Sequence, residues 1–355
     1  MNAAVIAVTS RGARLGTAIA GVLEKHGHIA QVYAVPGVAE EIPGVTRLQG
    51  TLSQVMGDLF SRYSGIVMIM ALGIVVRTIA PHIRDKRTDP AVVAMDEGGS
   101  FAISVLSGHV GGANDLARLL AGELESTAVI TTATDVSGVP AVDVIARDFK
   151  LEPEPPASVK KFNAALARGE KITVYTMYDL PFPESEFLAV RPWEMKDENS
   201  LWLRVMVTGQ SAIDTSDRDL LLRPRNIVVG VGCKKGAGTG DIIREIKVSL
   251  NIAGRSPLCV RALATINDKT SENGLIEASG ILGVPLLGFG PGEINGAIEK
   301  YGLKKSDFVM KKMGVGGVCE PAAMLACRNG RLLAPKRKAK GITVAVAEER
   351  SGWWE

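Results

Sequence analysis

Short apolar runs recur along the first 150 residues, and the segments between them carry apolar residues at helical spacing. The apolar runs cover residues 3–8, 29–35, 65–70 and 91–95. The run of residues 65–70 has no polar interruption, which is typical of a strand that is buried on both faces. The segment LSQVMGDLF, residues 52–60, instead spaces its apolar side chains as an amphipathic helix does. Strands that alternate with helices predict a parallel, helix-covered sheet, so we expect an N-terminal α/β domain at residues 1–150.

The pattern changes after residue 150. The segment LEPEPPAS, residues 151–158, is a linker rich in proline and glutamate, and Ser158 is a candidate cap for the helix that follows. The strand-like segments KITVYTM and LWLRVMV then flank a loop-rich stretch. We predict a small α+β middle module at residues 151–222, which spaces or covers its neighbours and carries no catalytic signature.

Three glycine-rich loops mark the last part of the chain. They are VGVGCKKGAGTGD, GFGPGEING and MGVGGVCEPAA, and each is predicted to join a strand to a helix. Loops of this kind at strand ends can form one rim that is open to a flat ligand, although tight turns alone also explain the glycines. We predict a C-terminal α/β domain at residues 223–355. The fold class is therefore α/β throughout, with a smaller module in the middle.

Length and composition narrow the class of protein. A chain of 355 residues is too long for one compact core, and 46% hydrophobic with 22% charged residues is ordinary for a globular protein. The longest apolar run, residues 65–76, is too short to cross a bilayer, and no targeting signal is visible, so we expect a cytoplasmic protein. The four cysteines form no CxxC pair and only four histidines occur, so we expect no metal site.

The charge is unevenly distributed. The net charge of +3 is made up of −2 for residues 1–150, −2 for residues 151–225 and +7 for residues 226–355. A partner rich in carboxylates or phosphates should therefore contact the last third. Aromatic residues make up only 5% of the chain and do not alternate with the lysines, which argues against RNA. The first loop reads GxGxxxG, which is neither a dinucleotide fingerprint nor a phosphate-binding P-loop. A small polycarboxylate fits these observations better.

The stretch MDEGGSFAISVLSGHVGGANDLARLL, residues 95–120, holds the clearest candidate for proton chemistry. His109 lies in a glycine-rich loop before a predicted helix, whose N-terminus offers unpaired amides and a positive dipole end. The acidic pair Asp96 and Glu97 ends the preceding strand. A base, carboxylates and amide donors within about twenty residues predict one reaction site. The alternative is that His109 is a structural loop residue that bonds a carbonyl.

Other residues are candidates for catalysis or ligand binding. Glu320 is a second candidate acid, although complementing the charge of a helix start is the simpler role for it. Arg77 interrupts an apolar surface and could also snorkel or pair with a nearby aspartate. Lys269 and Glu272 lie in a loop and have no evident packing role. The predicted substrate-binding residues are Arg77, Gly111, Gly112, Asn114, Gly232, Lys234, Lys235, Lys269, Glu272, Gly316 and Gly317.

Five segments are specific enough to indicate a family. The first is GIVVRTIAPHIRDKRTDPAVVAMDEGGSFAISVLSGHVGGANDLA, and the others are VGVGCKKGAGTGD, INDKTSENGL, MGVGGVCEPAAML and KGITVAVAEE. They resemble the CbiG family, the cobalt-precorrin-5A hydrolases of anaerobic cobalamin synthesis. The resemblance runs from end to end and is weak only in the middle module.

The resemblance implies a substrate and a reaction. The substrate would be a cobalt-containing, ring-contracted tetrapyrrole with a δ-lactone between a ring-A acetate and the extruded carbon. Water would open the lactone, and that carbon would leave with its methyl group as acetaldehyde, giving cobalt-precorrin-5B. The cobalt is carried by the substrate, so no cofactor is expected. The expected partners are this corrinoid polycarboxylate and neighbouring pathway enzymes, without nucleic acid or membrane, and a homodimer is an open alternative.

Roles for the candidate residues follow as a hypothesis. His109 would be the general base, kept neutral by the helix N-terminus, and Asp96 or Glu97 would orient it or act as the acid. The amides of Gly111 and Gly112 would hold the lactone oxyanion.

The resemblance also divides the work between the domains. Relatives similar only to the C-terminal part serve the aerobic pathway, which needs no lactone hydrolysis. This favours chemistry in the N-terminal domain and corrinoid binding in the C-terminal one, with His109 facing residues 234–240 and 311–320 across a cleft. The alternatives are a non-catalytic corrinoid carrier or pathway scaffold and, with less support, a nucleotide-dependent enzyme.

Overall fold

The chain folds into two compact units, Met1–Val139 and Pro140–Glu355. The computed structural model describes residues 1–85, 88–109, 111–132, 139–197 and 201–354, except for the side chains of Phe308 and Lys312. The sequence analysis placed the first boundary at residue 150. Helix α6 (Val142–Asp148) instead packs against the strand and helix that follow it, so the first unit ends before this helix.

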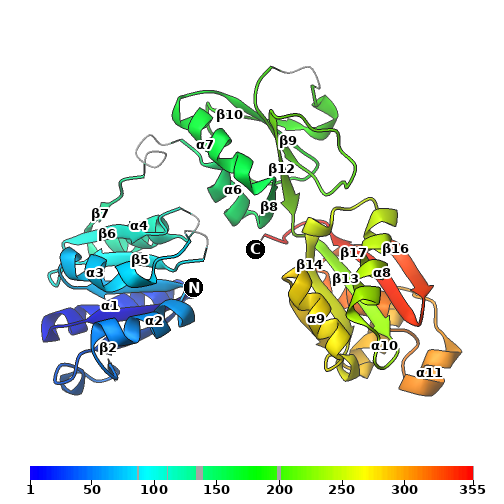
Figure 1. The fold of residues 1–355 in the computed structure, drawn as a ribbon, viewed down its shortest axis with the longest axis horizontal. Helices are drawn as coiled ribbons and strands as arrows, with labels where there is room; N and C mark the ends of the chain where they lie inside the picture. Colours follow the sequence, from blue (N-terminus) through cyan, green and yellow to red (C-terminus); the bar gives the residue numbers. More distant parts are fainter. Residues whose placement is uncertain (86–87, 110, 133–138, 198–200, 355) are drawn as a thin grey trace. The chain divides into compact units, whose positions relative to one another are not determined.

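The first unit is a sheet with helices on both faces (Figure 1). Its elements are β1 (Asn2–Ala7), α1 (Ser10–Lys25), β2 (Ile29–Ala34), the 3-10 helix η1 (Ala39–Glu41), β3 (Thr46–Arg47), α2 (Leu52–Arg62), β4 (Gly65–Ile69), α3 (Leu72–Ile79), the 3-10 helix η2 (Ala80–His82), β5 (Ala91–Met95), β6 (Phe101–Leu106), α4 (Ala113–Leu124) and β7 (Thr127–Val129).

Alternate side chains of each central strand point to opposite faces of this sheet, which makes both faces apolar. In β1, Val5 packs in a core with α1 and α4, whereas Ile6 packs in a second core with α2 and α3. Both side chains are fully buried. The uninterrupted apolar runs of the sequence are explained by this double burial, and the predicted N-terminal α/β fold is confirmed.

The direction of the last two strands differs from the expectation of a parallel sheet. The sheet order is β3-β2-β1-β4-β5-β6-β7, and the first five strands are parallel. β6 is antiparallel to β5, and β7 is parallel to β6. Only residues 96–100 join β5 to β6, and a parallel crossover needs a dozen residues or more. Gly99 takes a φ of +73° in this turn, a conformation that favours glycine.

The second unit contains two further five-stranded sheets. Its elements after α6 are β8 (Leu151–Glu154), η3 (Pro156–Ser158), α7 (Val159–Ala167), β9 (Ile172–Thr176), β10 (Leu188–Pro192), η4 (Trp193–Met195), β11 (Arg204–Val207), β12 (Asp219–Pro224), β13 (Ile227–Cys233), α8 (Thr239–Ile252), η5 (Pro257–Cys259), β14 (Val260–Ile266), η6 (Asn267–Lys269), α9 (Asn273–Leu282), β15 (Leu286–Phe289), α10 (Pro291–Lys300), α11 (Asp307–Met313), α12 (Cys319–Ala326), β16 (Gly330–Ala339) and β17 (Ile342–Glu349).

The middle sheet has the order β10-β9-β11-β12-β8. The neighbouring strands β11 and β12 are joined by an ion pair between Arg204 and Asp219, in which Nε and Nη2 donate to the two carboxylate oxygens at 2.6 and 2.8 Å. Both side chains are buried. Burial acts to raise the pKa of Asp219, but the hydrogen bonds from Arg204 and Ser216 outweigh it and the pKa is lowered. The Asp219 carboxylate is therefore ionised and stabilises the pairing of β11 with β12 through Arg204.

The C-terminal sheet has the order β15-β14-β13-β17-β16 (Figure 1). β13, β14 and β15 are parallel, so the loops that follow them lie at one edge of the sheet. Helices α8 and α9 cover one face, and α10 and α12 cover the other. The loop of MGVGGVCEPAA follows helix α11 and not a strand, so that part of the sequence prediction was wrong. Within the described part of the chain, every helix is too short or too polar to span a bilayer.

Helix α12 lies directly on the backbone of β13 at Gly230. A Cβ atom at this position would lie 1.8 Å from the carbonyl oxygen of Cys319 and 3.0 Å from the Cβ of Ala323. Glycine is required here because any side chain would push the helix off the sheet.

This close approach gives a stability prediction. Gly230→Ala should lower the free energy of unfolding by about 2–3 kcal/mol, since the backbone has to move. Gly240→Ala, in the first turn of α8 with no atom within 4 Å of the added Cβ, should cost nothing measurable. Thermal unfolding followed by circular dichroism would compare the two variants, and equal midpoints would contradict the assignment.

Candidate functional site

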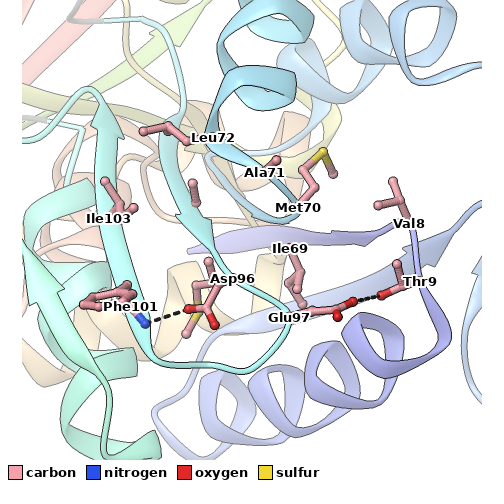
Figure 2. A pocket seen from close by; sticks show the side chains of 12 residues that line it. Val8, Thr9, Ile69, Met70, Ala71, Leu72, Asp96, Glu97, Phe101 and Ile103 are labelled. Carbon is pink, nitrogen blue, oxygen red and sulfur yellow. Dashed lines mark hydrogen bonds between the residues drawn. The ribbon is translucent and has the colours of Figure 1, made fainter.

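A pocket of about 330 Å³ opens at the carboxyl ends of β1, β4 and β5 in the first unit (Figure 2). Most of its wall is apolar, and Leu72 and Phe101 line it while remaining 42% and 49% exposed. Asp96 and Glu97 also line it, as does Thr9 at the end of β1. Carboxyl ends of parallel strands are where open α/β sheets bind ligands.

Glu97 is held by a contact between distant parts of the chain. The hydroxyl of Thr9 donates to Oε2 of Glu97 at 2.8 Å (Figure 2). The same hydroxyl oxygen accepts the Gly12 amide at 3.0 Å and so caps α1. Glu97 is an exposed residue, and this hydrogen bond orients its carboxylate at the pocket wall beside the first turn of α1.

Asp96 is engaged by the turn that follows β5. Its Oδ1 accepts the Phe101 amide at 2.8 Å (Figure 2). Its Oδ2 accepts the Gly98 amide at 3.1 Å. Partial burial acts to raise the pKa of Asp96, but these amides outweigh it and the pKa is lowered. An ionised carboxylate with both oxygens occupied is suited to hold the β5–β6 turn and poorly suited to donate a proton.

The structure separates His109 from both carboxylates. Leu106 at the end of β6 pairs with Val92, whereas Ala102 near its start pairs with Met95. The loop of His109 therefore lies at the opposite edge of the sheet from Asp96 and Glu97, one strand length or about 15 Å away. The sequence prediction that Asp96 or Glu97 orients His109 was wrong, because it assumed that β6 does not reverse the chain.

The amides that begin α4 are used within the His109 loop. The Gly112 amide donates to the His109 carbonyl at 3.1 Å, the Ala113 amide to Ser107 at 3.2 Å and the Asn114 amide to Gly108 at 3.0 Å. Gly112 has a φ of +87° at the helix cap. The prediction that the Gly112 amide holds an oxyanion was wrong, since this amide is already paired. The role predicted for the Gly111 amide is untested.

Two further predicted residues of this unit have different surroundings. The Asn114 side chain is buried, and its Nδ2 donates to the hydroxyl of Thr132 at 3.1 Å, which ties the loop to the chain after β7. Arg77 is exposed on α3 and is not among the residues that line the carboxyl-edge pocket. Binding of substrate by either residue stays a prediction.

In the second unit, the loops after β13 and β14 enclose a pocket of about 450 Å³. Lys235 and Glu272 line this pocket. Glu272 joins the two loops, because it accepts the Gly236 amide at 3.0 Å and the Lys269 ammonium at 2.8 Å. Lys269 first, and the Gly236 amide second, lower the pKa of Glu272. Lys269 and Glu272 thus form an ion pair with each other, and binding of substrate by either residue stays a prediction.

The remaining predicted residues of this unit have packing contacts. The Lys234 amide donates to the Gly341 carbonyl at 3.0 Å, and its exposed side chain passes that turn. Gly232 accepts the Thr343 hydroxyl at 3.2 Å, and the Gly316 amide donates to Asn295 Oδ1 at 3.1 Å. Gly317 is buried.

Glu320 lies in the first turn of α12, where its Oε1 accepts the Lys336 amide of β16 at 3.0 Å. This bond gives Glu320 a role at the sheet edge, and its candidacy as a catalytic acid is untested.

Sequence reasoning identified Asp96 and Glu97 among the residues that line this pocket and missed the others, which include Thr9, Leu72 and Phe101. Thr9 and Leu72 both follow apolar strands within a few positions, so the rule that ligands bind at carboxyl ends could have identified them. Phe101 could not have been found in this way, because its place depends on the reversal of β6. Among the described side chains, no group of three His, Cys, Asp or Glu residues could hold a metal ion.

The chain matches family models along most of its length. The matches are to "Cobalamin synthesis G N-terminal" at residues 54–135, "Cobalamin biosynthesis central region" at residues 140–224 and "Cobalamin synthesis G C-terminus" at residues 227–347. A cobalt-precorrin-5A hydrolase from Priestia megaterium is 32% identical over 97% of this chain and 94% of its own length. The hydrolase of the same name from Salmonella typhimurium is 32% identical over 85% of this chain and 87% of its own. A solved structure of a cobalamin biosynthesis protein G homologue from Sulfolobus solfataricus covers 98% of this chain and 97% of its own, with 22% identity and a TM-score of 0.43.

The hydrogen bonds of Asp96 give a pH-dependent prediction. Asp96→Ala should lower the stability of the first unit by about 1–2 kcal/mol at pH 7, because two backbone amides lose their acceptor. The folded-state pKa lies below the unfolded one, so the contribution is complete above the unfolded value of about 4 and is lost as the pH falls through the folded value. The difference from wild type should therefore shrink below about pH 4.

Urea unfolding at pH 7, 5 and 3 would measure this difference. Asp58→Ala is the matched control, since Asp58 makes only an exposed ion pair with Arg62 and should change stability by less than about 0.5 kcal/mol. Equal losses in the two variants at pH 7 would refute the role given to Asp96.

Proposed function

The chain belongs to the CbiG family, and from this membership we propose that it is a cobalt-precorrin-5A hydrolase of cobalamin biosynthesis. The observation that carries the proposal is the extent of the match, since all three family regions follow one another in order and a hydrolase of that name aligns over 97% of the chain. A match of this extent includes both the pocket of the first unit and the loop pocket of the second.

The proposed reaction has two stages. Water adds to the lactone carbonyl and the ring-A carboxylate is freed, which leaves a hydroxyl group on the extruded carbon. Loss of the hydroxyl proton and cleavage of the carbon–carbon bond then release acetaldehyde, and the electron pair of that bond stays with the macrocycle. The protein has to supply a base for each proton that is removed and hold the macrocycle in place.

The first unit offers two candidate bases. His109 follows β6, and Glu97 follows β5, at opposite edges of one sheet. Because these two residues are about one strand length apart, only one of them can be within hydrogen-bonding distance of the water that attacks the lactone. His109 as the base, facing the loops of the second unit, stays a prediction from the sequence.

The second unit supports binding of the carboxylate arms. Lys235 lines the loop pocket, and the amides that begin α8 and α9 lie around it. Lysine ammonium groups and helix N-termini both favour carboxylates. The charge of +7 for residues 226–355 adds attraction over a longer range.

Acetaldehyde release tests the proposal against a non-catalytic corrinoid carrier. The full chain, incubated anaerobically with cobalt-precorrin-5A, should release one acetaldehyde for each lactone that is opened, measured by trapping as a hydrazone and by mass spectrometry of the corrinoid. A carrier would bind the corrinoid and leave its mass unchanged. Binding without release would therefore refute the hydrolase and leave the carrier.

The charge of the loop pocket gives a second prediction. Lys235→Glu should raise KM about tenfold and leave kcat within about twofold, because a lost carboxylate contact is worth about 1.4 kcal/mol per factor of ten. Lys247→Glu, which makes the same charge change on the exposed side of α8, is the control. Equal rises in KM in both variants would mean that overall charge, and not the pocket, binds the arms.

A further inference from the structure

We infer that the pocket at the carboxyl ends of β1, β4 and β5 takes the lactone-bearing edge of the macrocycle, and that Glu97 is the catalytic base there. The inference rests on the proposed function and names the site and the base for the same reaction. It replaces the single site predicted from His109, Asp96 and Glu97 together.

The position of the pocket is the first argument. β1 has β2 on one side and β4 on the other, and the strand order 3-2-1-4-5 changes direction between β1 and β4. The loops after β1 and β4 therefore leave toward opposite faces and open a crevice between them, which is where doubly wound sheets bind their ligands. Thr9 and residues 69–72 line the pocket at this point.

The chemistry of the wall is the second argument. None of the described residues that line the pocket is Lys or Arg, and two are carboxylates. These two carboxylates repel the acetate and propionate arms of the substrate and do not repel the uncharged, methyl-bearing lactone edge. Leu72 and Phe101 are exposed as well as lining the pocket, so they offer apolar contact to the flat ring.

The state of the two carboxylates is the third argument. Asp96 uses both oxygens to accept backbone amides of its own turn. Among the described residues, Glu97 is hydrogen-bonded through Oε2 to the Thr9 hydroxyl, which leaves Oε1 to bind a water molecule (Figure 2). Of the two carboxylates, only Glu97 is both fixed in position and able to accept a proton from water.

The resulting step is balanced without a further reactant. Glu97 takes one proton from water as the water oxygen bonds to the lactone carbonyl carbon. The ester carbon–oxygen bond then breaks, and the proton passes from Glu97 to the departing alkoxide oxygen. The net change is one water added across one ester bond, and Glu97 returns to its ionised form.

Replacing Glu97 tests the base. Glu97→Gln keeps an oxygen that can accept the Thr9 hydrogen bond, so it should fold and bind substrate normally while kcat for acetaldehyde release falls about 10²–10⁴-fold. Glu41→Gln is the control. Glu41 lies in η1 and accepts a 2.6 Å hydrogen bond from Ser10, the residue that follows Thr9 at the start of α1, but it does not line the pocket. Its kcat should stay within about twofold of wild type.

Replacing the apolar rim tests the position of the ring. Leu72→Asp and Phe101→Asp should each raise KM about tenfold by placing a further negative charge against the substrate. Ile74→Asp puts the same charge on an equally exposed position of α3 that does not line the pocket, and its KM should not change.

These outcomes separate the inference from the proposed function. Wild-type release of acetaldehyde combined with near-normal kcat in Glu97→Gln would overturn the inference and leave the hydrolase intact. If kcat fell in His109→Ala and not in Glu97→Gln, the inference would also be overturned, and the catalytic base would lie in the loop after β6. Equal KM values for Leu72→Asp and Ile74→Asp would contradict binding of the macrocycle at this pocket. Absence of release by wild type would refute the function itself.

Discussion

The short turn between β5 and β6 sets the direction of the last two strands of the N-terminal sheet. The Asp96 carboxylate accepts two backbone amides of this turn, and five residues are too few for the chain to cross over and continue in parallel. β6 and β7 therefore run against the other five strands. The loop after β6 opens at one edge of the sheet, and every loop that follows β1 to β5 opens at the other. The position of each candidate group relative to the others is a consequence of this reversal.

Much of the fold could be predicted from the sequence because burial leaves a direct pattern. The run GIVMIM became β4, the segment after Thr51 became α2, and the strands and helices of residues 227–300 follow the apolar and glycine-rich pattern. Strand direction leaves no such pattern, because an apolar strand looks the same in either orientation. The prediction that Asp96 or Glu97 orients His109 was wrong for this reason. His109, Asp96 and Glu97 are close in sequence. Asp96 and Glu97 follow the end of β5, and His109 follows the end of β6. Because β5 and β6 are antiparallel, these two strand ends lie on opposite sides of the sheet.

The two units divide the chemical properties that a large, anionic and partly apolar ligand requires. The described lining of the N-terminal pocket is apolar with two carboxylates, whereas the loop pocket of the second unit contains Lys235 within the most basic third of the chain. Glu272 holds the two loops of the second pocket together. Its carboxylate accepts the Lys269 ammonium of its own loop and the Gly236 amide of the loop after β13. The ion pair of Lys269 and Glu272 lies within the protein, whereas Lys235 is exposed and lines the pocket.

The hydrogen bond between Thr9 and Glu97 joins residues 88 positions apart. A ribosome that has just released β1 has made only one wall of the pocket, and the opposite wall emerges with β5 and β6 about ninety residues later. The site cannot form as a local structure during synthesis, because no short stretch of the chain contains both walls. The pocket forms only when β1, β4, β5 and β6 have all paired in the sheet in the correct order. The pocket therefore requires that the chain has been made at least as far as Ile103, well beyond β1.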